Sequence, residues 1–332
     1  MSINVSVIVP TYNRADLIPL TLQTIVNQSH PPKEIIVVDD GSTDNTEQVV
    51  RAFGSGVRYI RIENSGECRA RNVGVSASKS EHVAFCDSDD LWHPDKLKLQ
   101  SSIFEATECD YSFTNFETVV DDVWSEQTKF DTMPPTFFDL PRRMISKDVF
   151  IIETPIFDRL LLNQPIFPST LMMTRTFFEN VGRWNEALGR IPSVDLEFHL
   201  RCVDYPNTGV VAAPVVGIRK HASNFSGNPL KLAIGEVAIL RYVLANNPSA
   251  QKYADTIQDQ ISRRAATSVA CAFEAGELEL ARKLMSAVPH SYRSWKLQAK
   301  NLILHSPDRI GQILRKVSML LAQKLRQDHL QG

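Results

Sequence analysis

Two clusters of acidic residues in the first half of the chain could bind polar groups or a metal ion. EIIVVDDGS places Asp39 and Asp40 directly after a short apolar run, and HVAFCDSDD places Asp87 and Asp89 directly after another. Ionised carboxylates accept hydrogen bonds from a base or a ribose, and hard oxygen ligands suit Mg²⁺ or Mn²⁺ held against substrate phosphates. One acid-rich turn is more often a solvated loop or a helix N-cap, but two turns that both follow buried strands favour a site.

The acidic clusters need a scaffold that brings them together, and the hydrophobic pattern predicts one. Strands are predicted at 5–9, 34–40, 57–62, 82–87 and 111–114, and helices at 15–28, 46–53, 67–78 and 94–105. This alternation is typical of βαβ units and of a Rossmann-like, mostly parallel α/β sheet flanked by helices. Ligands of such sheets bind at the carboxyl ends of the strands, so the acidic clusters are expected on one rim.

Other polar residues are expected on the same rim. The first and fourth strands end in further candidates: Pro10, Thr11, Tyr12, Asn13 and Ser88. Arg71 in NSGECRARNVGV carries a guanidinium that suits phosphate or carboxylate recognition, although pairing with Glu67 one helical turn away is an alternative. Asp90 lies in the same acidic turn, but it could simply cap the helix that begins near Pro94 and have no role in a site.

The second half of the chain predicts a different organisation. Residues 116–165 hold several prolines and clustered acids, which predicts loops, a short helix and a flap facing an acceptor. A strand at 167–174, helices at 175–181 and 195–205, and a strand at 210–219 follow. From Lys231 the pattern is helical, with candidates at 232–245, 254–274, 278–287, 292–305 and 309–326. We expect two halves of one α/β domain, 1–115 and 116–230, and a helical appendage, 231–332.

Composition and charge exclude several classes of protein. The chain has 332 residues, 43% of them hydrophobic and 22% charged, as in folded globular proteins. Its net charge is −2, but the residues from Lys231 onward hold 15 basic and 8 acidic side chains, so the part before them is acidic. The acidic first part, and the lack of a basic patch with interleaved aromatics, argue against nucleic acid as a partner.

The compartment can also be predicted. The apolar runs are shorter than the roughly 18 residues of a transmembrane helix, and the N-terminal MSINVSVIVPTYN lacks the basic region of a secretory signal. Five scattered cysteines without a CxxC pair indicate free thiols, which predicts a cytoplasmic protein. The basic, amphipathic segment 309–326 either packs on protein or contacts the inner membrane surface peripherally. A homodimer is one alternative for the oligomeric state.

Four ordered motifs resemble one known family. VSVIVPTYNR, EIIVVDDGSTD, NSGECRARNVGV and FCDSDD, in this order and spacing, look like the bacterial type of family 2 glycosyltransferase with a GT-A fold. The resemblance covers roughly residues 3–226. It implies a metal-dependent, inverting transfer of a hexosyl or N-acetylhexosaminyl group from a nucleotide-diphospho-sugar, most often UDP-linked. The acceptor would be a hydroxyl of a glycan or lipid-linked glycan, as in the biosynthesis of a cell-surface polysaccharide.

The resemblance implies roles for the residues that end the strands. The donor nucleotide would contact Pro10, Thr11, Tyr12, Asn13, Asp39, Asp40, Arg71, Asp87 and Ser88. Asp39 would lie at the base, Arg71 near the phosphates, and Asp87 at the ribose or the sugar. Asp89 would hold a Mn²⁺ or Mg²⁺ ion. His221, in the Arg-Lys-His segment after the last strand, would join Asp89 at the metal or contact the diphosphate, although a lone histidine is more often a structural hydrogen-bonding residue.

The acceptor side carries the residue expected to act as the base. FPSTLMMTR, VGRWNE and DLEFHLR resemble the acceptor-side segments of the family, and the count back from the final Leu-Arg pair places the catalytic Asp on Asp195. A carboxylate there would deprotonate the acceptor hydroxyl as it attacks the anomeric carbon. Glu197 is the second-ranked base, but two residues apart on a helix the two carboxylates do not share a face. The chain departs from the family at Val194, where Glu is usual, and at Arg183, where a second Gly is usual.

Two tryptophans near these motifs have two interpretations. Trp92 and Trp184 are candidate platforms for a sugar or an acceptor, and large aromatics equally often fill a core.

Other classes of protein are weaker matches. A sugar-phosphate nucleotidyltransferase shares the sheet, but the sequence lacks a Gly-rich loop after the first strand. A haloacid-dehalogenase-like phosphatase would need Asp-x-Asp-x-Thr at that strand. A non-catalytic nucleotide-sugar-binding or scaffold protein is the alternative that Val194 motivates.

Overall fold

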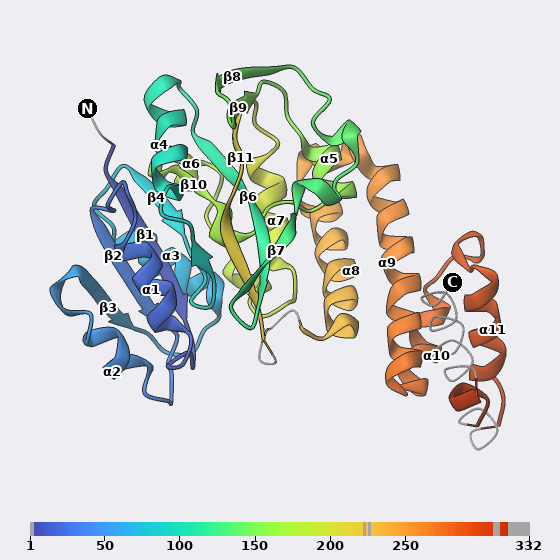
Figure 1. Ribbon diagram of the computed structural model, residues 1–332. Coiled ribbons are helices and arrows are strands. Elements are labelled where there is room, and N and C mark those ends of the chain that lie inside the picture. The colour runs from blue at the N-terminus through green and yellow to red at the C-terminus, as the bar shows by residue number, and fades with distance from the viewer. Residues whose placement is uncertain (1–2, 222–223, 225–226, 308–312, 318–332) are drawn as a thin grey trace. The chain divides into compact units, whose positions relative to one another are not determined.

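The computed structural model describes residues 3–221, 224, 227–307 and 313–317. The chain divides into two compact units, Met1–Asn224 (unit 1) and Phe225–Gly332 (unit 2). Unit 1 is an α/β structure and unit 2 is helical (Figure 1). The expected α/β class with a helical C-terminal region is therefore confirmed.

Unit 1 contains one sheet. Its strands are β1 (Val5–Thr11), β2 (Glu34–Asp39), β3 (Val57–Arg61), β4 (His82–Phe85), β5 (Leu91–Trp92), β6 (Tyr111–Val120), β7 (Val123–Thr128), β8 (Arg142–Ser146), β9 (Val149–Ile152), β10 (Met172–Thr174) and β11 (Thr208–Lys220). Within the described residues their order is β3-β2-β1-β4-β10-β6-β11-β9-β8, with β5 beside β11 and β7 beside β6. β3, β2, β1 and β4 pair in parallel, as do β6 and β11, whereas β10 runs antiparallel between β4 and β6. The central sheet is mixed and mostly parallel.

Helices cover both faces of this sheet, so β1 is buried along its whole length. The helices of unit 1 are α1 (Ile18–Val26), α2 (Thr46–Arg51), α3 (Glu67–Ala77), α4 (Lys96–Ala106), α5 (Phe157–Leu162), α6 (Arg175–Asn180) and α7 (Val194–Cys202). The odd-numbered valines of β1 pack with α1, and Ile8 faces α3 on the other side. Successive strand residues point to opposite faces, which explains why a strand covered twice reads as a continuous apolar run.

Gly74 lets α3 approach β1 closely. A Cβ atom at this position would lie 2.3 Å from Cγ2 of Ile8, which is far inside van der Waals contact. A residue larger than glycine would push the helix away from the strand. This close packing fixes the helix that carries Arg71.

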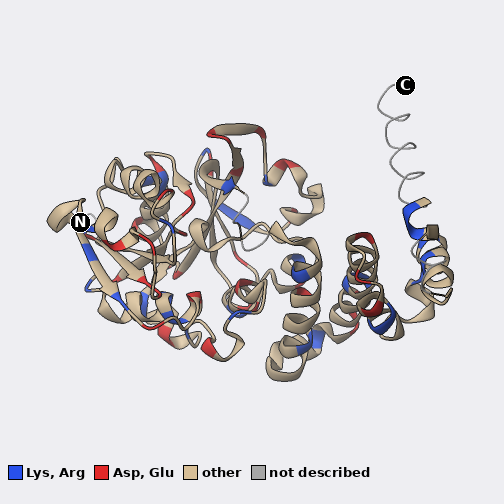
Figure 2. Cartoon of the chain, turned by 90° about the horizontal axis from the view of Figure 1, so that it is seen from below, with Lys and Arg blue, Asp and Glu red and all other residues tan. Residues whose placement is uncertain are grey.

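The register of the parallel strands brings the acidic clusters to one rim. Thr11 of β1 is the Cα partner of Asp39 of β2, and the Asp40 N–H donates to the Thr11 carbonyl at 2.9 Å. The Cys86 N–H donates to the Ile8 carbonyl at 3.0 Å, which aligns the end of β4 with the same edge. Figure 2 views the structure from this side, where acidic segments lie on several of the loops.

The prediction for residues 116–165 was partly wrong. The short helix is present as α5, but the rest includes β7, β8, β9 and the last part of β6. Asp121 and Asp122 join β6 to β7 with positive φ values of 49° and 62°. Two positive φ values are typical of the tight turn that best fits a hairpin, which is usually signalled by Asn-Gly or Asp-Gly. Asp-Asp is a weaker signal, so the hairpin was missed.

The strand predicted at 167–174 is also shorter than expected. Pro168–Thr170 forms a 3₁₀ turn and the strand begins at Met172. Proline cannot donate to a ladder and fits the first turn of a helix, which explains the late start. The other elements predicted in unit 1 are present with ends shifted by a few residues.

Unit 2 consists of helices packed around their own apolar cluster. They are α8 (Pro229–Asn246), α9 (Ala254–Ala275), α10 (Leu278–Ser286) and α11 (Trp295–Leu304). Four of the five predicted helices are therefore present. The fifth, 309–326, lies outside the described residues except for 313–317, which are helical. Among the described residues, none of the helices has the length and apolar character needed to cross a membrane.

Candidate active site

A buried guanidinium holds the acid that follows β4. Arg71 Nη2 donates to Asp87 Oδ1 at 2.8 Å and lies 3.4 Å from Glu67 Oε2. The Arg71 side chain is 1% exposed and that of Asp87 is 28% exposed. Burial raises the pKa of Asp87, and the positive charge of Arg71 opposes that shift. The predicted pair with Glu67 is therefore one part of a buried network that also includes Asp87.

Asp195 belongs to the same electrostatic neighbourhood. It is the second residue of α7, which begins after Ser193 in a left-handed conformation with φ 66°. Asp195 is half-buried. The pKa of Asp195 is raised to about 7, first by burial and then by the negative charges of Glu67 and Asp87, while the positive charge of Arg71 opposes the shift. A carboxyl group with a pKa near neutrality can act as a general base at physiological pH.

Glu197 is committed to a different interaction. Its two carboxylate oxygens accept hydrogen bonds from Nε and Nη2 of Arg201, both at 2.8 Å. Glu197 is buried, while Asp195 keeps part of its surface open. Of the two carboxylates on α7, that of Glu197 is therefore occupied by Arg201, and that of Asp195 is the one with surface open to a ligand.

The second acid after β4 meets the histidine after β11. His221 Nε2 lies 3.0 Å from Asp89 Oδ2, although the two residues are 132 positions apart. Arg14 Nε lies 3.6 Å from the same oxygen, and the Arg219 guanidinium donates to the Asp89 carbonyl. β11 carries His221 to the rim because it runs parallel to β6 and pairs with β5, which begins at Leu91, shortly after Asp89.

This pair fits a metal that is completed by a substrate. Within the described part of the chain, no group of three or more His, Cys, Asp or Glu side chains is arranged to hold a metal ion. Asp89 and His221 offer one carboxylate and one imidazole. Mg²⁺ in particular is usually bound through one or two carboxylates, waters and substrate phosphates. The donor set therefore suits a divalent ion that arrives with a diphosphate.

Asp90 has a structural role and does not cap a helix as predicted. Its Oδ2 accepts from Ser169 Oγ at 2.5 Å and its Oδ1 from the Arg219 N–H at 3.2 Å, whereas the residue before α4 is Asp95. Burial and the neighbouring Asp89 hold the pKa of Asp90 well above its usual range. Asp90 connects the acidic turn with β11.

Each carboxylate oxygen of the two acids at the end of β2 accepts a hydrogen bond from the protein. Asp39 Oδ1 accepts from the Ser42 N–H at 2.8 Å and its Oδ2 from Tyr59 Oη at 2.5 Å. Asp40 accepts from the backbone N–H groups of Ser65 and Gly66, at 2.6 and 2.8 Å. Both side chains are buried. They shape the loops around the rim.

The residues that end β1 differ in exposure. Pro10 and Thr11 are buried within the strand, while Tyr12 is 45% exposed. Asn13 has a left-handed φ of 51°, and its Oδ1 accepts from the Thr43 N–H at 2.8 Å. Tyr12 is thus the ring that this segment presents at the surface.

Ser88 and both tryptophans lie in packed surroundings. The Ser88 carbonyl accepts from Thr21 Oγ1 at 3.0 Å. Trp92 and Trp184 are each 2% exposed, and Trp92 Nε1 donates to the Ser169 carbonyl at 3.0 Å. The packing interpretation of the two tryptophans is therefore confirmed. Neither presents a platform to solvent.

Sequence reasoning overlooked two participants. Ser169 Oγ accepts from the Asp87 N–H at 2.9 Å and donates to Asp90, so one hydroxyl connects two acids of the turn. Glu67 was read as a partner of Arg71 alone, yet its charge reaches Asp87 and Asp195 as well. Glu67 lies inside the motif NSGECRARNVGV, at the start of a helix predicted to begin at the rim. That position could have indicated that Glu67 belongs to the site.

Comparisons with known proteins indicate the family and the fold. Residues 6–162 match the model of the family described as glycosyl transferase family 2. The glycosyltransferase TuaG of Bacillus subtilis (strain 168), named for teichuronic acid biosynthesis, is 39% identical over 122 residues, which are 36% of this chain and 48% of that protein. An uncharacterized glycosyltransferase of Rickettsia felis is 27% identical over 254 residues, 75% of this chain and 38% of its own length. The chain thus spans less than half the length of these relatives.

A solved structure shows the same fold. Residues 1–349 of S. aureus TarS, in complex with UDP-GlcNAc, superpose with a TM-score of 0.62 at 21% identity, covering 97% of this chain and 92% of that one. The likeness confirms the expected GT-A architecture. The family match thus covers residues 6–162, just under half of the chain, and the solved structure adds a likeness in fold.

Proposed function

We propose that this protein is a metal-dependent, inverting glycosyltransferase that moves a sugar from a UDP-sugar to a hydroxyl of a glycan or lipid-linked glycan. The observation that carries the proposal is the convergence of Arg71, Asp87 and Asp195 on one rim, beside the pair of Asp89 and His221. Anion recognition, a base of suitable pKa and metal donors are the parts that such a transfer needs.

Arg71 and Asp87 supply the donor contacts in this proposal. Arg71 carries a buried positive charge, which suits a diphosphate. Asp87 keeps 28% of its side chain open and can accept hydrogen bonds from ribose or sugar hydroxyls. The exposed ring of Tyr12 flanks the base. The complex of TarS with UDP-GlcNAc supports the UDP-sugar class of donor.

Asp195 deprotonates the acceptor hydroxyl. A half-buried carboxylate with a pKa of about 7 is a stronger base than an exposed one and is still largely ionised at pH 7.5. The acceptor oxygen then attacks the anomeric carbon from the face opposite the leaving diphosphate, and the proton goes to Asp195.

Asp89 and His221 would hold the divalent ion. When bound, Mn²⁺ or Mg²⁺ offsets the negative charge that develops on the leaving diphosphate. Asp89 is oriented for this by the Arg219 guanidinium, which bonds its carbonyl, and by Arg14.

The direct experiment measures UDP release from a panel of UDP-, GDP- and dTDP-sugars, with and without Mn²⁺. We expect slow hydrolysis of one UDP-sugar that depends on the metal, and stabilisation of the fold by UDP in the same wells. Stabilisation without turnover, for every donor and with glycan acceptors added, would instead support a non-catalytic binding protein. If neither turnover nor stabilisation is observed with any donor, the assignment of the donor site is overturned.

The variant Asp195→Asn separates the base from the binding site. Because a general base contributes about 10²- to 10⁴-fold, transfer should fall by that amount while UDP affinity stays within a few-fold. The folded-state pKa of about 7 lies above the ordinary 3.8, so ionisation of Asp195 costs stability as the pH rises between these values. At pH 8 the variant should therefore unfold at a temperature no lower than the native chain. Full activity would remove Asp195 as the base.

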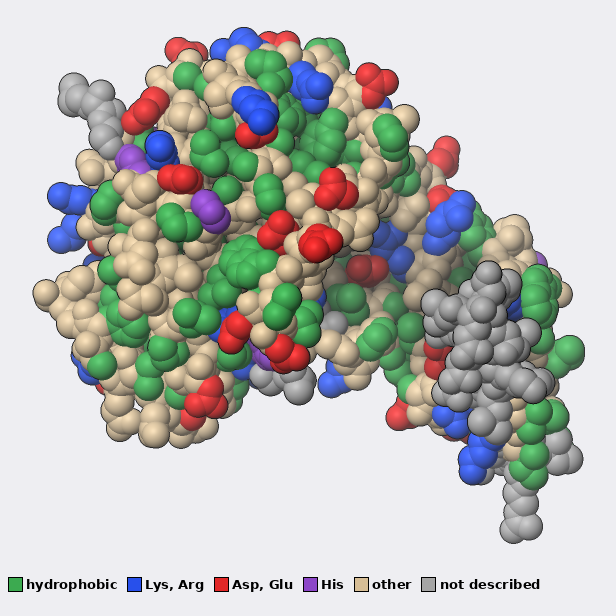
Figure 3. Space-filling view, in the orientation of Figure 1, with side chains coloured by type: hydrophobic (Ala, Val, Ile, Leu, Met, Phe, Trp, Pro, Cys, Tyr) green, Lys and Arg blue, Asp and Glu red, His purple; other side chains and the backbone are tan. Residues whose placement is uncertain are grey.

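Contact with a membrane surface is a finer part of the proposal. The basic sequence 309–326 supports it, as do Trp295 and Leu302 of α11, each 74% exposed and seven residues apart on one helix face. Figure 3 shows apolar side chains at the surface of this part of unit 2. Co-sedimentation with vesicles, with and without anionic lipid, should show binding that needs the anionic lipid. Equal recovery with neutral vesicles or with none would contradict it.

A further inference from the structure

Trp184 joins the donor side of the rim to the helix that carries Asp195. Its ring lies 4.6 Å from the guanidinium carbon of Arg71. It also stacks on Phe198 with 4.0 Å between ring centroids. Phe198 lies on α7, about one helical turn after Asp195. One aromatic side chain therefore contacts both the proposed anion-binding residue and the helix of the proposed base.

The indole ring holds Arg71 without using its hydrogen-bond donors. Arg71 Nη2 bonds to Asp87, whereas Nε and Nη1 are buried and have no hydrogen-bond partner among the described residues. Buried N–H groups are normally paired, because leaving them unpaired is costly. The π face attracts the cation electrostatically. The guanidinium thus stays in place while two of its buried nitrogens keep hydrogen-bonding capacity that the described residues do not use.

The backbone of Trp184 is fixed to both neighbouring helices. Asn72, which follows Arg71 on α3, donates through Nδ2 to the Trp184 carbonyl at 2.9 Å, and its Oδ1 accepts from the Trp184 N–H at 3.1 Å. Arg201 on α7 donates to the Arg183 carbonyl at 2.7 Å. The indole therefore cannot move far without disturbing α3 or α7.

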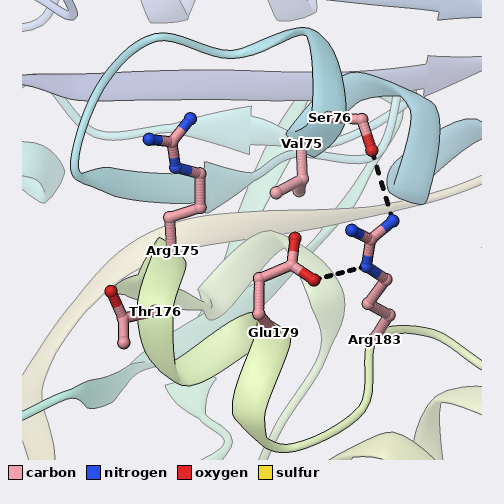
Figure 4. A pocket seen from close by; sticks show the side chains of 6 residues that line it. All are labelled: Val75, Ser76, Arg175, Thr176, Glu179 and Arg183. Atoms are coloured by element: carbon pink, nitrogen blue, oxygen red, sulfur yellow. Dashed lines mark hydrogen bonds and ion pairs between the residues drawn. The ribbon is translucent and has the colours of Figure 1, made fainter.

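Arg183 braces the start of this segment. Gly182 and Arg183 have left-handed φ values of 96° and 55°, a conformation that disfavours residues with a side chain. Arg183 Nε pairs with Glu179 at 2.5 Å, and its Nη1 donates to Ser76 Oγ at 3.4 Å (Figure 4). A cavity of about 290 Å³ adjoins the brace, lined by Val75, Ser76, Arg175, Thr176, Glu179 and Arg183. These contacts hold the unusual backbone that places Trp184.

We propose that Trp184 is a positioning residue that couples binding of the donor's anionic group at Arg71 to the placement of Asp195. The inference rests on the proposed function. An anion bonded to Nε and Nη1 fixes the guanidinium over the indole, and the indole keeps Phe198, and with it α7, in the arrangement that presents Asp195. Trp184 touches neither substrate in this proposal and acts through its two neighbours.

The test compares Trp184→Leu with Phe178→Leu. Phe178 is buried in the same aromatic cluster, with its ring 5.9 Å from that of Phe198 and 6.0 Å from that of Phe85. Both variants should unfold at lower temperature. Because a desolvated cation–π contact is lost, Trp184→Leu should weaken UDP affinity about tenfold and also lower kcat, while Phe178→Leu should keep UDP affinity within about twofold. Trp184→Phe, which retains a ring, should recover most of the affinity.

A double variant completes the test. Once Arg71 is replaced by Ala, the added change Trp184→Leu should weaken UDP binding no further. Equal UDP affinity in Trp184→Leu and the native chain, or additive losses in the double variant, would overturn the coupling. A native chain that neither binds UDP nor transfers sugar would instead overturn the proposed function, so the two failures are distinguishable.

Discussion

The turns after β2 and β4 look alike in the sequence and differ in the structure. Each places adjacent or alternate acids directly after a buried strand. After β2, the carboxylates of Asp39 and Asp40 are buried and accept hydrogen bonds from the protein at both oxygens. After β4, Asp87 and Asp89 meet Arg71 and His221 and keep part of their surface open.

The difference teaches that position at a strand end does not define what a carboxylate does. An acid whose two oxygens each accept a hydrogen bond from a backbone N–H group or a phenol helps to organise loops. An acid that faces a guanidinium or an imidazole, with lone pairs left over, can exchange partners with a ligand. We therefore infer that the turn after β2 serves mainly as a frame and that the turn after β4 is the part of the rim suited to chemistry, while the donor contacts of Asp39 and Asp40 stay a prediction.

The largest expected effect comes from the turn after β4. Asp89→Asn removes the carboxylate proposed to hold the metal, so transfer should fall about a thousandfold, equivalent to roughly 4 kcal/mol of transition-state stabilisation. The melting temperature should change little, because Asp89 is partly exposed. Asp95→Asn, six positions further along, is the control and should keep full activity. Unchanged Mn²⁺ dependence in Asp89→Asn would place the metal elsewhere.

The turn after β2 should respond in stability instead. Asp40→Asn replaces one acceptor oxygen with an NH₂ group that faces a backbone N–H of the 65–66 segment. Since hydrogen bonds to a charged group contribute about 1.5–3 kcal/mol, the free energy of unfolding in urea should fall by about that amount. A variant with native stability and lost UDP binding would reverse the roles of the two turns.

The sequence predicts that both acidic turns lie on one rim, but it does not predict most of the difference between them. The runs VSVIV and EIIVV predict buried strands because β-branched residues fit a sheet covered on both faces, and parallel pairing then brings the acids to one rim. Which carboxylate oxygens accept hydrogen bonds from the protein depends on Ser42, Tyr59 and the 65–66 backbone, whose positions are set by tertiary packing. The pairing of Asp89 with His221 was suggested by motif resemblance, since 132 residues separate them.

The missed hairpin of β6 and β7 has a local cause, whereas β9 (VFII) is a short buried apolar run. β7 (VWSEQT) is largely exposed and lacks a long apolar run, so its hydrophobic pattern carries little signal. The turn before it depends on positive φ values at Asp121 and Asp122, which a sequence pattern of Asp-Asp does not specify. Likewise, the burial of Trp184 follows from its contacts with Arg71 and Phe198, which no spacing rule connects.

A smaller effect concerns charge near the base. The acid limb of kcat/KM should have an apparent pKa near 7, because Asp195 must be deprotonated to act and burial raises its pKa to about 7. Glu67→Gln removes a negative charge that contributes to this raised pKa, so the limb should move to lower pH and the relative rate at pH 6 should rise. Glu47→Gln on α2 is the control. A limb that moves to higher pH would contradict the electrostatic assignment.

The smallest expected effect returns to the turn after β2. Tyr59→Phe removes the phenol that donates to Asp39 Oδ2 at 2.5 Å, while the Ser42 N–H still bonds Oδ1 and Arg61 Nη1 remains 3.9 Å from Oδ2. With one partner of a buried carboxylate gone, the free energy of unfolding should fall by about 1–2 kcal/mol. Tyr205→Phe removes a half-exposed phenol and should change it by less than about 0.5 kcal/mol. Sugar transfer should persist in both variants, because Tyr59 supports the frame and touches none of the proposed donor-binding oxygens after β4. Loss of transfer in Tyr59→Phe at native stability would show instead that Asp39 acts directly on the donor, and the contrast between the two turns would fail.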